Sequence, residues 1–122
     1  GKALVIDGDR ASGKTTLAIA IAKSNGSYTT CSLREMMGSV FSFSSILRFE
    51  PDTVIVEDEV NELSKFKERL KPFISEPKMH VERVGEESKL IRTPNFIFCT
   101  GEIEPLGIDA DSRRFKILSI RN

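Results

Sequence analysis

The chain has 122 residues, enough for one compact domain with a single core and too few for two. Hydrophobic residues make up 39% and charged residues 30%, a composition typical of folded domains and unlike that of disordered chains. Lys and Arg number 18, as do Asp and Glu, so no overall charge attracts nucleic acid or an anionic membrane, and any binding of polyanions has to be local.

The cysteine content and the lack of targeting segments indicate the compartment. Cys31 and Cys99 are far apart and lack the spacing of a zinc site or a redox pair, so we expect two buried thiols in a reducing environment. No apolar run approaches the roughly 20 residues that cross a bilayer, and no signal peptide opens the chain. The sequence therefore predicts an intracellular protein with no membrane partner. It begins Gly1-Lys2-Ala3, without Met and almost directly on a strand, which favours a segment of a longer protein.

The first third of the chain predicts a strand, a helix and a second strand. Ala3–Asp7 is a continuous apolar run, typical of a strand buried on both faces. Lys14–Ser24 carries a broad apolar stripe at helical spacing, and Asn25–Gly26 supplies a stop. Ser27–Ser32 is rich in β-branched and polar residues and predicts a short strand.

A second helix is expected after this strand. Ser32 has the residue type of a helix N-cap, and Thr53–Val56, after the break at Pro51–Asp52, predicts the next buried strand. Between them an apolar periodicity favours helix, and it is carried by Leu33, Met36, Met37, Phe41, Ile46, Leu47 and Phe49.

The remainder predicts a surface helix, a hairpin and two further strands. Asn61–Lys71 has apolar residues at helical spacing with charges between them. Met79–Val84 and Lys89–Thr93 are two strand-like runs around a polar tip, Gly85–Ser88. Two apolar runs follow as strands, Phe96–Cys99 and Phe115–Ile120. This order predicts an α/β fold with a parallel sheet covered by helices.

The segment from Gly8 to Thr15 matches the phosphate-binding pattern G-x-x-x-x-G-K-[ST], after a buried strand and at the start of a helix. Its backbone N–H groups and the helix N-terminus are suited to surround a phosphate. Lys14 can reach the β- and γ-phosphates, and the Thr15 hydroxyl can ligate magnesium (Mg2+). The expected nucleotide-binding residues are Gly8, Asp9, Arg10, Ala11, Ser12, Gly13, Lys14, Thr15 and Thr16.

An acidic segment directly follows the Thr53–Val56 strand. A P-loop needs a carboxylate for magnesium and a base that polarises the attacking water, at the end of a neighbouring strand. We assign Glu57 to the magnesium side and Asp58 as the base and a further magnesium ligand; a frame shifted by one residue would use Asp58 and Glu59 instead. The alternative without function is a solvated acidic turn.

Arg113 and Arg114 precede the final strand and follow two aspartates. A guanidinium that reaches the γ-phosphate of a neighbouring subunit can raise the rate by roughly 10³ to 10⁵. The residues alone fit a surface salt-bridge cluster equally well.

Together, the P-loop, the acidic strand end, the hairpin, the next buried strand and the Arg113-Arg114-Phe115 segment resemble a superfamily 3 helicase ATPase domain of viral, phage or plasmid replication proteins. The resemblance runs from about Ala3 to Ile120. It implies a P-loop NTPase fold of the AAA+/ASCE type. Such a domain has three α/β/α layers, a mostly parallel five-stranded central sheet and a β-hairpin insert before the fourth strand, with residues 1–122 as a single domain.

The resemblance also implies function. It implies a hexameric ring that hydrolyses ATP with magnesium between subunits and moves single-stranded DNA or RNA through a central channel, in the cytoplasm or in a host nucleus. Lys14, Glu57 and Asp58 would be catalytic. Arg113 or Arg114 would act in trans as the arginine finger.

Two departures from the family pattern affect these expectations. The strand Phe96–Cys99 is followed by Thr100 and Gly101, where the family usually has Asn at the second position; Thr100 can take part of the sensor role, but Gly101 has no side chain to orient water, so hydrolysis is expected to be slow. In the hairpin, the candidate nucleic-acid contacts are His80, Arg83 and Lys89, beside the acids Glu86 and Glu87. A solvated charged turn explains that segment about as well.

Two other functions remain open from the sequence. A nucleoside or nucleotide kinase would share the P-loop, but it predicts an arginine-rich lid, and the arginines of the Asn61–Thr93 insert are scattered. A nucleotide-dependent assembly module with little hydrolysis would explain Gly101.

Overall fold

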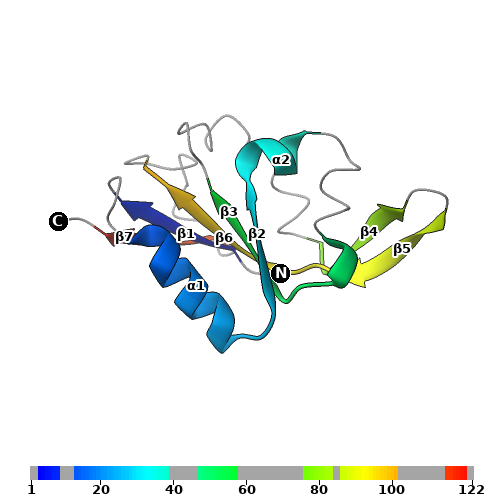
Figure 1. Ribbon diagram of the computed structural model, residues 1–122, viewed down its shortest axis with the longest axis horizontal. Coiled ribbons are helices and arrows are strands. Elements are labelled where there is room, and N and C mark those ends of the chain that lie inside the picture. The colour runs from blue at the N-terminus through cyan, green and yellow to red at the C-terminus, as the bar shows by residue number, and fades with distance from the viewer. Residues whose placement is uncertain are drawn as a thin grey trace.

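The computed structural model describes residues 3–8, 13–38, 47–57, 76–83, 86–101 and 115–120 of the chain. Its helices and strands give an α/β architecture with a parallel sheet and a separate antiparallel hairpin (Figure 1). The helix predicted over Asn61–Lys71 lies outside the described residues.

The parallel sheet confirms the predicted strands and settles their order. Across the sheet the strands run β2-β3-β6-β1-β7, and each neighbouring pair is parallel. Each strand starts or ends within one residue of its prediction. Their bounds are β1 (Ala3–Gly8), β2 (Tyr28–Ser32), β3 (Thr53–Glu57), β6 (Asn95–Thr100) and β7 (Phe115–Ile120).

The helices follow local signals in the sequence. Helix α1 (Lys14–Ser24) has the predicted bounds, and its C-cap is Asn25. Helix α2 (Leu33–Met37) begins with a capping box, in which the Ser32 side chain accepts from the Glu35 N–H and the Glu35 carboxylate accepts from the Ser32 N–H, both at 3.1 Å. None of the described helices is long and apolar enough to cross a membrane.

The prediction that helix continues to Phe49 is wrong for its last residues. Leu47–Phe49 forms a short 3-10 turn, η1, in which Leu47 is buried and Phe49 is 82% exposed. A helix with three residues per turn separates these two side chains by about 240°, so both cannot face the core.

The two faces of the sheet bury different sets of side chains, because successive strand residues point to opposite sides. Helix α1 covers one face with Ala18 and Ala22, against Ile6, Ile55 and Ile97. The other face packs under α2, η1 and the hairpin. Its buried residues include Val5, Val54, Val56, Phe96, Phe98, Leu33, Met36, Leu47, Val81 and Ile91.

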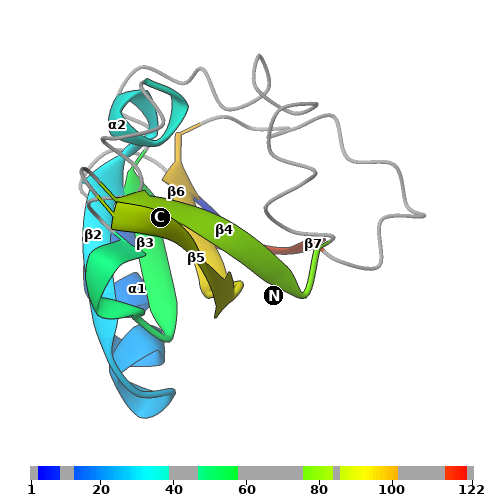
Figure 2. The ribbon, with the colours of Figure 1, turned by 90° about the vertical axis from the view of Figure 1, so that its right-hand side faces the viewer.

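The hairpin consists of β4 (Lys78–Arg83) and β5 (Glu86–Arg92) and stands beside the main sheet (Figure 2). Arg83 pairs with Glu86, so the predicted tip over Gly85–Ser88 is too long: Glu86–Ser88 belongs to β5. Backbone pairing with β4 extends the strand further towards the turn than the polar residues indicate.

Because the strands are parallel, their carboxyl ends lie together on one side of the sheet and their amino ends on the other. Gly8, Ser32, Glu57 and Thr100 end their strands together at what we call the carboxyl edge. The hairpin and η1 lead into the starts of β6 and β3 at the opposite, amino edge. Ligand sites in open parallel sheets usually form at the carboxyl edge.

Candidate functional site

The start of α1 follows β1 at the carboxyl edge, where a left-handed residue turns the chain into the helix. Gly13 is the N-cap of α1 with a φ of 86°, a conformation that favours glycine. The Lys14 ammonium donates a hydrogen bond to the Gly8 carbonyl oxygen, with 2.7 Å between Nζ and O. The side chain of Lys14 therefore reaches back from the first turn of α1 to the end of β1.

A side-chain hydrogen bond at this edge joins two segments that are far apart in the sequence. The Thr15 hydroxyl donates to the Glu57 carboxylate, with 3.1 Å between Oγ1 and Oε1. Thr15 lies in the first turn of α1, and Glu57 is the last residue of β3.

A hydroxyl and a carboxylate oxygen at this separation are the hard ligands that magnesium takes in proteins, with water or phosphate oxygens completing its shell. Thr15 and Glu57 therefore fit such an ion. Within the described ranges no group of three or more His, Cys, Asp and Glu side chains could hold a metal, but a site completed by phosphate does not need one.

The end of β6 supports the first turn of α1. The Cys99 thiol donates to the Lys14 carbonyl oxygen, with 4.0 Å between Sγ and O. Burial, followed by the nearby Glu57 charge, raises the pKa of Cys99 to about 11. Burial and the charges of Glu35 and Glu57 raise the pKa of Cys31 to about 12. Both cysteines are free and buried, as predicted, and both are thiols at neutral pH.

The described part of the chain brings together several of the predicted site residues. Gly8, Gly13, Lys14, Thr15 and Glu57 meet at the carboxyl edge; Thr16 is exposed on α1. Thr100, the predicted sensor, ends β6 at the same edge and is fully buried, in register with Asp7. The remaining predicted nucleotide, base and finger residues lie outside the described residues: Asp9, Arg10, Ala11, Ser12, Asp58, Arg113 and Arg114.

The three candidate nucleic-acid contacts are not at this edge. His80 is exposed on β4, and the Lys89 ammonium forms an ion pair with Glu50 at 3.0 Å. Only the backbone of Arg83 is described. The hairpin carries these residues beside the amino edge instead.

Sequence reasoning missed two residues of the carboxyl edge. Asp7 is 1% exposed at the end of β1, directly before Gly8, and an acid at the end of an apolar run was the available signal. The contact of Cys99 with Lys14 had no signal, because it depends on β6 lying between β1 and β3.

The amino edge carries a groove of about 430 Å³. It is formed by three segments that each lead into a strand, and it is lined by Asn25, Glu50, Pro51, Asp52, Arg92, Thr93, Pro94 and Asn95. Hydrogen bonds join these segments: the Asn95 N–H donates to the Asp52 carbonyl at 2.9 Å, and the Ser27 N–H to the Asp52 carboxylate at 2.9 Å.

The chain belongs to the family described as a family of unknown function, DUF5906, whose model matches residues 6–114. No curated protein is significantly similar to it.

Among solved structures, the chain is similar to the C-terminal region of NrS-1. An A-form apo structure of that region aligns with a TM-score of 0.74 and 20% identity, over 98% of this chain and 29% of the other. An apo structure of residues 305–718 of NrS-1 aligns with a TM-score of 0.73, also at 20% identity, over 97% of this chain. This chain spans less than a third of the length of the chains it matches, and the likeness is one of fold.

Proposed function

We propose that this chain is the ATP-hydrolysing domain of a ring-forming replicative helicase, with a P-loop NTPase fold of the AAA+/ASCE type. The observation that carries the proposal is the hydrogen bond between Thr15, in the G-x-x-x-x-G-K-[ST] segment, and Glu57, at the end of β3. In the sheet, β3 is separated by β6 from β1, the strand that precedes this segment. A P-loop enzyme needs its hydroxyl and carboxylate magnesium ligands adjacent.

The same contact favours one of the two frames for the acidic segment. Glu57 hydrogen-bonds to Thr15, so we give it the magnesium side, and Asp58 follows as a further magnesium ligand and as the residue that polarises the attacking water. Bound magnesium would neutralise charge on the β- and γ-phosphate oxygens. Lys14 would exchange the Gly8 carbonyl for a phosphate oxygen, and the N–H groups from Gly8 to Thr15 would surround the phosphates.

The other residues of the proposed mechanism act between subunits or on the nucleic acid. Arg113 or Arg114 of one subunit completes the site of its neighbour in a ring of six by stabilising charge on the transferring phosphoryl group. Hydrolysis then moves the hairpin, whose His80, Arg83 and Lys89 contact single-stranded DNA or RNA. The antiparallel hairpin between β3 and β6 in the chain supports this part of the proposal.

Gly101 supports slow turnover. Thr100 is buried at the end of β6, which lies between β1 and β3. The next residue, Gly101, has no side-chain amide to orient water. If hydrolysis is slow enough, the chain acts as an assembly module that binds ATP between subunits and scarcely hydrolyses it.

ATP turnover with magnesium, measured over a range of protein concentrations, tests the proposal. Lys14→Ala is the inactive variant. Lys23→Ala is its matched control, because Lys23 is an exposed lysine in the last turn of the same helix. Binding of a fluorescent ATP analogue is measured alongside.

Specific activity that rises with concentration, is abolished by Lys14→Ala and survives Lys23→Ala supports the motor. Tight binding of the analogue without turnover supports the assembly module instead. Flat specific activity indicates a self-contained site, as in a kinase. Equal binding by the chain and Lys14→Ala refutes a P-loop site altogether.

A further inference from the structure

The amino edge carries an exposed aromatic side chain that the fold does not use. Phe49 is 82% exposed, whereas Leu47, two residues earlier, is 1% exposed. The Arg48 guanidinium lies over the Phe49 ring, 5.5 Å from its centroid. One face of the ring is thus backed by a cation, and the exposed ring is available for stacking.

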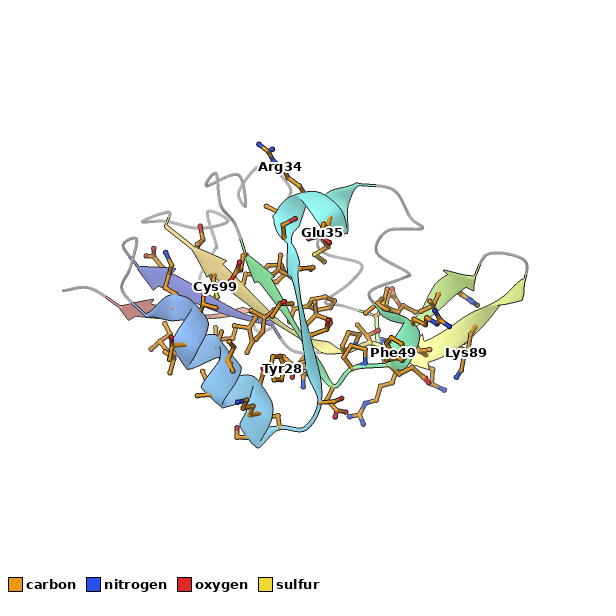
Figure 3. All side chains as sticks on the ribbon, viewed as in Figure 1. Tyr28, Arg34, Glu35, Phe49, Lys89 and Cys99 are labelled. Atoms are coloured by element: carbon orange, nitrogen blue, oxygen red, sulfur yellow. The ribbon has the colours of Figure 1, made fainter. Side chains whose placement is uncertain are left out.

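Phe49 adjoins the groove at the amino edge. Its neighbour Glu50 lines that groove and is held by the ion pair to Lys89, so the end of η1 and strand β5 are joined at this point. Figure 3 shows Phe49 and Lys89 close together at the base of the hairpin. The groove volume, about 430 Å³, falls in the range of small-ligand sites.

The groove also contains a polar group without a partner. Thr93 lines it and is 4% exposed, and its hydroxyl makes no hydrogen bond. A buried hydroxyl left without a partner costs stability, and a ligand in the groove that hydrogen-bonds to it would offset that cost. Asn25 and Asn95 also line the groove, and the Asn25 side-chain amide donates to the Ile21 carbonyl oxygen at 3.0 Å.

Cations continue from the groove onto the outward face of the hairpin. On this face Lys78 pairs with Arg92 and His80 with Leu90, and all four side chains are exposed. Arg92 and Lys78 form no ion pair with another described residue. Of the two acids that line the groove, Glu50 forms an ion pair with Lys89, and Asp52 accepts from the Ser27 N–H and hydroxyl while it keeps its charge. Lys78, Lys89 and Arg92 outnumber these two acids. The surface is therefore locally suited to a polyanion although the chain has no net charge.

We propose that this surface binds single-stranded nucleic acid, with one base stacked on Phe49 and turned to the groove and the adjoining phosphates on Arg92 and Lys78. Proteins usually bind single strands by stacking the bases on aromatic side chains and by placing cationic side chains beside the phosphates. This proposal gives the proposed helicase domain a site for its single strand, and it rests on the proposed function. It assigns the strand a site at the edge opposite to Lys14 and Thr15, reached through Phe49 and the groove.

The test is the affinity of the 122-residue chain for fluorescein-labelled dT15 and U15, measured by anisotropy without nucleotide at two salt concentrations. Phe49→Leu keeps an apolar side chain and removes the stacking face, so affinity should fall roughly 5- to 150-fold. Phe49→Tyr should restore it. Arg92→Gln should lower the affinity for all oligonucleotides by a similar factor. It should also reduce the slope of log affinity against log salt concentration by about one. Arg34→Gln, an exposed arginine on α2, is the matched control.

Thr93→Val tests the groove separately. It keeps the shape of the side chain, so the fold should keep its stability or gain some, while oligonucleotide affinity falls several-fold. Unchanged affinity in Phe49→Leu and Arg92→Gln would overturn the proposal. So would a dimer in sedimentation velocity that Phe49→Leu dissociates without any effect on oligonucleotides, because the surface would then bind a second copy of the chain.

The two proposals fail separately. Lys14→Ala should abolish ATP binding and leave the effects of Phe49→Leu and Arg92→Gln intact. Absence of those effects in a chain that hydrolyses ATP refutes the nucleic-acid site alone. Presence of those effects when the chain with Lys14 intact binds no ATP refutes the motor alone.

Discussion

Thr15→Val separates the contribution of the Thr15 hydroxyl to folding from its contribution to chemistry. Valine keeps the β-branched shape of threonine, so the start of α1 should form as before. The variant loses the 3.1 Å hydrogen bond to Glu57. Because that bond is exposed to water, its loss should lower the free energy of unfolding by only about 1 kcal/mol.

The effect on catalysis should be far larger. If Thr15 and Glu57 hold magnesium, the valine variant loses one protein ligand, and turnover should fall by roughly 10²-fold or more. Thr15→Ser keeps the hydroxyl and should retain most activity. Raising the magnesium concentration should rescue part of the lost activity in Thr15→Val.

Urea unfolding gives the stability of each variant, and a phosphate-release assay across a magnesium titration gives the activity. Turnover by Thr15→Val equal to that of the unaltered chain, at every magnesium concentration, would refute the assignment of Thr15. A loss of several kcal/mol in stability would show instead that the contact is structural.

Three further predictions concern the fold around the site. Ser32→Ala removes the N-cap of α2 and should cost about 0.5–2 kcal/mol in urea unfolding, whereas Ser32→Asp should retain most of the stability. Gly26→Ala should cost more than 1 kcal/mol, because φ is 124° there and the added Cβ would collide with the Asp52 carboxylate; a variant as stable as the original would contradict the geometry. Cys31 and Cys99 have pKa values of about 12 and 11, above the 9.0 of an exposed thiol, so the unfolded chain loses these protons first and the free energy of unfolding should fall as pH rises from 9 towards 11. Replacing both cysteines by alanine should flatten that slope, and an unchanged slope would assign it to other groups.

The elements that could be predicted from sequence are those whose signal is local. The bounds of α1 follow from its apolar stripe and the Asn25–Gly26 stop, and the strands follow from runs buried on both faces. The capping box at Ser32 is also local, since its partner is three residues away. The motif from Gly8 to Thr15 predicted a site at the carboxyl edge for the same reason.

Only the tertiary structure decided which distant residues meet. Thr15 and Glu57 are 42 residues apart, and their contact depends on the register of β3, which places Glu57 at the carboxyl edge. Phe49 shows the opposite outcome: an apolar periodicity predicted helix, and a short 3-10 turn leaves its side chain in solvent. The amino-edge groove draws on three separate segments. Periodicity reports which side of an element is apolar, whereas the partner of each side chain is set by strand order and register, which involve the whole chain.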